Sequence, residues 1–83
     1  MTFALDGKFL TSDYDEEADI LYLWVDGPCT AVTYETSRGH LVQLDPETRE
    51  FVGVAIVDYR ARWEGHEIAI EIPTVEERVL QLV

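Results

Sequence analysis

The chain has 83 residues, 47 % of them hydrophobic, and 17 acidic against 6 basic side chains give a formal charge of −11. This length predicts a single small domain spanning residues 1–83, and the apolar content argues against a disordered chain. The charge disfavours nucleic-acid binding, because phosphate backbones would be repelled, and is typical of a small domain that stays in solution.

The first part of the chain predicts two hairpins. Asp6-Gly7 separates residues 3–5 from a strand at residues 8–14, and this dipeptide favours a tight hairpin because both positions tolerate positive φ. The acidic turn, residues 13–19, then reverses the chain into a strand at residues 19–26. A Gly-Pro pair ends that strand, because proline cannot donate a hydrogen bond to a neighbouring strand.

Three more strands follow in the middle of the chain, at residues 31–36, 40–45 and 51–59. The turn at residues 45–50 contains Pro46, which presets φ, and Asp45, whose side chain can accept hydrogen bonds from backbone amides of the turn. Gly53 is a candidate for a β-bulge.

The C-terminal part predicts one more strand and a helix. Isoleucines alternate with other residues over 67–72, which indicates a strand with one apolar face. Thr74 and Glu77 have the spacing of a capping box, and apolar residues give the segment 75–83 a helical apolar side. The predicted fold class is α+β: an antiparallel β-meander of about five to six strands with one short C-terminal helix.

Two strands are apolar on both faces, at residues 20–25 and 51–57. A single antiparallel sheet usually exposes one face to water, so a strand of this kind needs a cover on each side. A short helix covers part of one face only. Curling of the sheet or a second copy of the chain must cover the rest, and we favour a homodimer.

The acidic turn matches the ligand pattern of a calcium-binding loop only in part. Asp13, Asp15, Glu17 and Asp19 have the spacing of the first ligands of a calcium loop, but Ala18 replaces the required glycine and Trp24 replaces the bidentate glutamate. We therefore predict no metal ligands here and leave open whether the turn binds cations non-specifically. Aspartates also favour turns because they accept hydrogen bonds from their own backbone.

Nothing in the sequence forms a catalytic motif. His40, His66 and Cys29 could in principle supply a nucleophile and a base, but their spacing does not support this, and one cysteine cannot form an intramolecular disulfide. The same residues make a poor zinc ligand set. We predict no catalytic, metal or cofactor-binding residues and no cofactor, so the protein is expected not to be an enzyme.

The remaining sequence features concern compartment and partners. The apolar runs are far shorter than the ~20 residues of a membrane helix, and no signal peptide is evident, so a soluble cytoplasmic protein without membrane contact is expected. The one basic cluster, Arg60-Ala61-Arg62-Trp63, could contact an acidic partner or the acidic surface of the chain itself; we favour the second.

Two segments together resemble a known family. Residues 14–23 read Tyr-Asp-Glu-Glu-Ala-Asp-Ile-Leu-Tyr-Leu, and residues 44–56 combine an aspartate-ended strand, a turn and Val-Gly-Val. This pattern resembles the prokaryotic family catalogued as domain of unknown function 2283 (DUF2283). The resemblance implies a small β-rich domain without assigned catalytic residues, and some relatives are suspected antitoxins of small basic toxins.

Three functions remain open at this point. The first is a non-enzymatic protein-binding or assembly module, which the two-sided strands favour. The second is an antitoxin-like neutraliser of a small basic toxin, for which the charge of −11 would accelerate encounter with a basic protein. The third is a small hydrolase that uses a carboxylate with His40 or His66.

Overall fold

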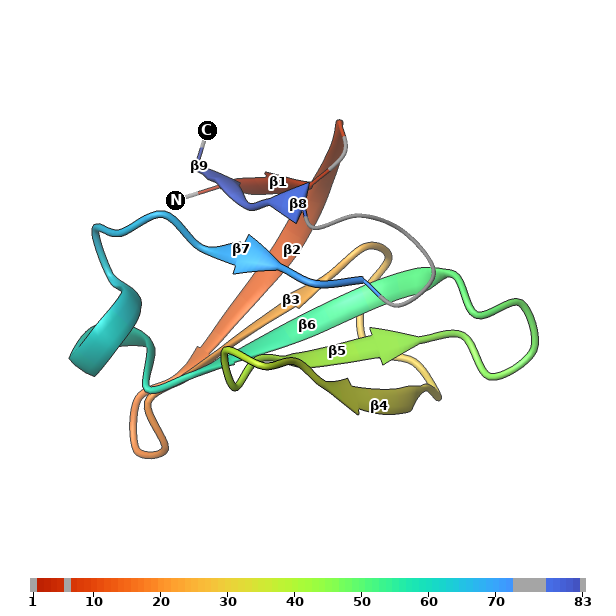
Figure 1. Cartoon of the computed structure of the whole chain (residues 1–83), viewed down its shortest axis with the longest axis horizontal. Helices are drawn as coiled ribbons and strands as arrows, with labels where there is room; N and C mark the ends of the chain where they lie inside the picture. The colour runs from red at the N-terminus through yellow and green to blue at the C-terminus, as the bar shows by residue number, and fades with distance from the viewer. Residues whose placement is uncertain (1, 6, 73–77, 83) are drawn as a thin grey trace.

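The computed structural model describes residues 2–5, 7–72 and 78–82, and within these the chain is nearly all β (Figure 1). The elements in chain order are β1 (Phe3–Leu5), β2 (Lys8–Asp15), β3 (Ile20–Trp24), β4 (Val32–Glu35), β5 (Leu41–Leu44), β6 (Phe51–Val57), the π-helical turn η1 (Tyr59–Trp63), β7 (Ala69–Ile70), β8 (Arg78–Val79) and β9 (Gln81–Leu82).

Seven strands form one antiparallel sheet in the order β4-β5-β6-β3-β2-β1-β9, and β7 pairs with β8. The predicted meander is correct within β1–β3 and within β4–β6. It is wrong between these halves, because β3 pairs with β6 and the chain passes both β6 and β5 before it enters β4 at the sheet edge (Figure 1). This order puts β3 and β6, the strands with two apolar faces, at the centre of the sheet.

The predicted turns are confirmed where the structure describes them. Leu5 pairs with Lys8, which leaves a two-residue hairpin loop, and Gly7 in that loop has φ 77°. The Asp45 carboxylate accepts hydrogen bonds from the backbone N–H groups of the next turn, at 2.8 and 3.0 Å. The pairing of β5 with β6 jumps over Val52, so the bulge lies one residue before Gly53.

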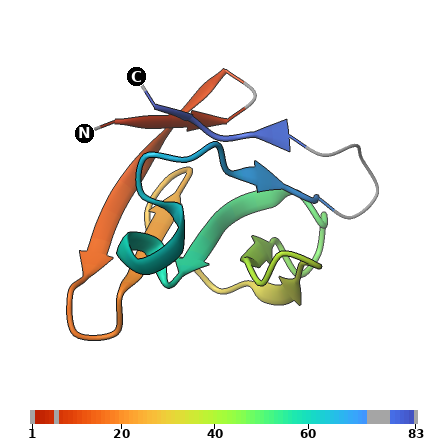
Figure 2. The ribbon, with the colours of Figure 1, turned by 60° about the vertical axis from the view of Figure 1, so that its left-hand side comes forward.

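The core lies between the inner face of the curled sheet and the C-terminal arm. In Figure 2 the sheet curls from β1 round to β4, and the arm that contains β7 and β8 closes over it. The buried side chains include Leu21, Leu23, Val42, Val54 and Ile56 from the sheet and Ile68, Ile70 and Ile72 from the arm. The alternating isoleucines predicted for residues 67–72 therefore cover the sheet.

The outer face of the central strands is covered in part by the chain itself. The Trp24 indole lies over Gly53, where a methyl group would lie 2.6 Å from Trp24 Cε3, and Ala55 beside it is buried. In the view of Figure 1, the connection between β3 and β4 also crosses behind β6. Sheet curling, one of the two covers expected from the sequence, and this connection thus cover part of the outer face, and the homodimer stays a prediction.

The predicted C-terminal helix is wrong for residues 78–82. These residues form β8 and β9, in which Val79 pairs with Ala69 and Gln81 with Ala4, and the buried Leu80 donates its N–H to the Ile68 carbonyl at 2.8 Å. The strands β7 and β1 are available as backbone partners for these residues. Pairing with them outweighs the local preference of the segment for a helix. The capping box at residues 74–77 lies outside the described residues. No helix in the described part of the chain is long and apolar enough to span a membrane.

Candidate binding surfaces

The acidic turn between β2 and β3 holds η1 in place. The Asp19 carboxylate accepts hydrogen bonds from the backbone N–H groups of Arg60 at 2.8 Å and Ala61 at 3.1 Å, and the Asp19 carbonyl accepts one from Tyr59 N–H at 3.0 Å. The first N–H groups of a helical turn have no partner inside it, so Asp19 caps η1. The turn also reverses the chain as predicted, with Asp15 paired to Ile20.

Tyr14 and Arg60 complete this cluster. Tyr14 donates its hydroxyl to the Asp19 carboxylate at 2.6 Å, a bond that raises the pKa of Tyr14 to about 12 and lowers the pKa of Asp19. The Arg60 guanidinium lies 4.7 Å from the centre of the Tyr14 ring and 3.9 Å from Glu16 Oε1. Arg60 therefore contacts the acidic surface of its own chain, as we favoured for the basic cluster.

Within the described residues, the carboxylates of the acidic turn are not grouped as ligands of a metal ion. Asp15 accepts a hydrogen bond from Ala18 N–H at 3.1 Å, which is the backbone contact expected of an aspartate in a turn. Within residues 2–5, 7–72 and 78–82, no three or more His, Cys, Asp or Glu side chains are grouped to hold a metal ion. The contacts of Asp15 and Asp19 are structural.

The structure does not join the three side chains considered for catalysis. His40 is completely buried, and neither ring nitrogen has a hydrogen-bond partner among the described residues. Cys29 and His66 are exposed. Across the described part of the chain, no hydrogen bond connects any of these three side chains to a carboxylate.

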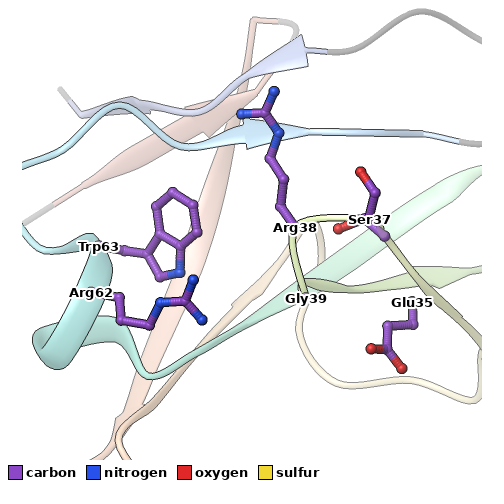
Figure 3. Close-up of a pocket in the computed structure, with 7 residues that line it drawn as sticks. Glu35, Ser37, Arg38, Gly39, Arg62 and Trp63 are labelled. Carbon is purple, nitrogen blue, oxygen red and sulfur yellow. The ribbon is translucent and has the colours of Figure 1, made fainter.

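A surface pocket of about 360 Å³ is lined by Gly39, the residue before His40, and not by His40 itself. The pocket lies between the β4–β5 turn, which contributes Ser37 and Arg38, and the end of η1, which contributes Arg62 and Trp63 (Figure 3). The His40 ring packs against Trp63 with 4.7 Å between ring centres. Burial, followed by the positive charges of Arg38 and Arg62, lowers the pKa of His40, so this imidazole stays neutral near pH 7.

Strand β4 forms a second candidate surface at the edge of the sheet. All four of its residues are exposed, and no described strand pairs with its outer edge. Val32 and Tyr34 are 37 % and 43 % exposed, and they lie on the face that continues the buried positions of β5, opposite Leu44 and Val42. Thr33 lies on the other face and bonds to Gln43 at 3.0 Å, which fixes β4 to the sheet.

The sequence did not single out Tyr34 or Arg38 as members of a site, and it indicated Arg62 only as part of the basic cluster. Arg38 lies between two predicted strands and Arg62 in the basic cluster, and only the fold brings these two segments to one pocket. The basic cluster around Arg62 was the one available signal. Comparisons with protein-family models, with curated proteins and with solved structures found no match, so the resemblance to DUF2283 stays a prediction.

Proposed function

We propose that the protein is a non-enzymatic protein-binding module that receives an extended segment of a partner along β4. The observation that carries the proposal is the exposed edge strand with two large apolar side chains, Val32 and Tyr34. Exposed sheet edges pair readily with other strands, and natural proteins usually protect them with lysine, proline, a bulge or a covering segment. Residues 32–35 contain no lysine or proline and no bulge.

The two faces of β4 specify the chemistry of the segment. A strand added to the edge aligns its side chains with those of β4 and places alternate residues on opposite faces. Apolar residues of the segment would lie beside Val32 and Tyr34, and polar or basic residues would lie beside Thr33 and Glu35. The partner segment therefore alternates apolar with basic side chains.

Charge favours a basic partner over a second copy. The chain carries a formal charge of −11, so two copies repel each other at long range, whereas a basic protein is attracted. An antitoxin-like neutraliser of a basic toxin is one form of this function. A second copy of the chain is the competing occupant of this edge, whereas the homodimer expected from the sequence would cover a face of the central strands.

Binding of a short synthetic peptide in which valine alternates with arginine tests the proposal. The informative variant is Tyr34→Lys, which places an edge lysine on β4. The matched control is Phe9→Lys, because Phe9 is also an exposed apolar residue, at 67 %, but lies on β2. We expect Tyr34→Lys to weaken binding about tenfold and Phe9→Lys to change it less than about twofold.

Two results would contradict this function. If the peptide binds wild type and both variants with equal affinity, attraction is a property of the overall charge and β4 has no special role. If light scattering shows a wild-type dimer that Tyr34→Lys converts to a monomer, the edge is used by a second copy, and the basic partner is wrong. Thermal unfolding of each variant checks that the fold is retained.

A further inference from the structure

Another surface pocket lies between η1, the segment that leads from η1 into β7, and the pair β1–β9, which Figure 2 shows next to one another. Its volume is about 380 Å³, at the lower end for small-molecule sites. Phe3, Tyr59 and Trp63 line it, although they come from β1 and from the two ends of η1. The fold therefore brings three aromatic side chains from separate segments to one pocket.

These aromatic side chains are held in place by the core. Phe3 and Tyr59 are 5 % and 6 % exposed and belong to the same buried cluster as Leu80, which also lines the pocket. Trp63 is partly buried, and its ring packs against His40 with 4.7 Å between ring centres. A ligand in the pocket would therefore meet a rigid wall of aromatic and aliphatic groups.

The charged side chains at the rim of the pocket are acidic. Glu67 lines it, and none of the described lining residues is lysine or arginine. Burial raises the pKa of Tyr59, the negative charge of Glu64 raises it further, and Arg60 offsets Glu64 only in part. The side of the pocket formed by Tyr59 is therefore at a negative potential, which favours a cation.

The two arginines of η1 are directed to other places. The Arg60 guanidinium lies 4.7 Å from the centre of the Tyr14 ring. The Arg62 guanidinium lies 5.9 Å from the centre of the Trp63 ring and extends toward the β4–β5 turn (Figure 3). Neither arginine lines the pocket, so a cation could enter it without contact to a like charge.

We propose that this pocket binds a small organic cation through a trimethylammonium group. Such a group carries apolar methyl groups, has no N–H donor that needs a partner, and is attracted by aromatic rings. A metal ion would instead require several oxygen ligands, which an aromatic and aliphatic wall does not supply. Phe3, Tyr59 and Trp63 would contact the methyl groups, and Glu67 would lie near the charge. The site is separate from the β4 edge and does not depend on the proposed function.

The test is a titration of the full chain, followed by NMR of the Trp63 indole and the Tyr59 ring. The probes are choline, acetylated trimethyllysine amide, and dimethylbutanol, the isostere of choline in which carbon replaces the charged nitrogen. We expect a saturable shift with the cations at millimolar concentrations and about tenfold weaker binding of the neutral isostere. The tighter cation shows whether the group is carried by a small molecule or by a methylated lysine side chain. Bound cation should also lower the pKa of Tyr59, because it offsets the charge of Glu64.

Two pairs of variants locate the site. Phe3→Leu removes a ring but keeps an apolar side chain, and its matched control is Phe51→Leu, a partly buried residue of β6 outside the pocket lining. We expect binding of choline to weaken about fivefold in the first and less than about twofold in the second. Glu67→Gln should weaken it about threefold and Glu47→Gln should not; both side chains are exposed, so this pair remains informative if Phe3→Leu disturbs the fold.

Three results would overturn the proposal. Absence of a saturable shift with both cations would exclude the site. Equal affinity for choline and dimethylbutanol would show that the pocket selects apolar surface and not positive charge. Equal weakening by Glu67→Gln and Glu47→Gln would show that the attraction is one of net charge.

Discussion

Replacing Gly53 with alanine tests whether the central strands are packed as closely as the structure indicates. The added methyl group would lie 2.6 Å from Trp24 Cε3 and 2.7 Å from the Leu23 carbonyl oxygen. Overpacking of this kind costs about 1–3 kcal/mol, and removal of a glycine from a strand recovers roughly 0.5–1 kcal/mol of it. We expect Gly53→Ala to lower the free energy of unfolding by about 1–2 kcal/mol, or the melting temperature by about 5–15 °C.

Urea unfolding of four chains measures this effect: wild type, Gly53→Ala, Trp24→Leu and the double variant. Trp24→Leu removes the indole but leaves the Leu23 carbonyl, so Gly53→Ala should cost less in that background than in wild type. An unchanged or higher denaturation midpoint for Gly53→Ala would refute the close approach of Trp24 to β6. Equal costs in the two backgrounds would show that the indole is not the group in contact.

Three further predictions concern the core, the acidic turn and the buried histidine. Leu23→Ala should cost about 2–5 kcal/mol in urea unfolding, because this side chain is fully buried; a smaller loss would indicate a looser core. Asp19→Ala should return the pKa of Tyr14 from about 12 toward 10.0 in an ultraviolet titration, and an unchanged value would contradict the hydrogen bond between them. The lowered pKa of His40 means that the unfolded chain takes up a proton more readily, so stability is retained above about pH 6.5 and falls as the pH drops from there toward the folded pKa. His40→Gln should flatten this slope and His66→Gln should not.

Local signals in the sequence predicted the turns and most strands of this fold. Asp45 accepts the amide hydrogen bonds expected of it, and Asp15 pairs across the acidic turn with Ile20. These features depend on a few neighbouring residues, whose conformational preferences survive in the folded chain. The order of the strands could not be predicted from these local signals. The pairing of β3 with β6 depends on which strands need burial on both faces.

The C-terminal error has a physical cause that local patterns do not contain. A capping box and apolar spacing favour a helix in an isolated segment, but the β-branched Val79 also suits a strand. Residues 78–82 instead pair with β7 on one side and with β1 on the other. The pocket was missed for the same reason, since Arg38 and Arg62 meet only through the fold.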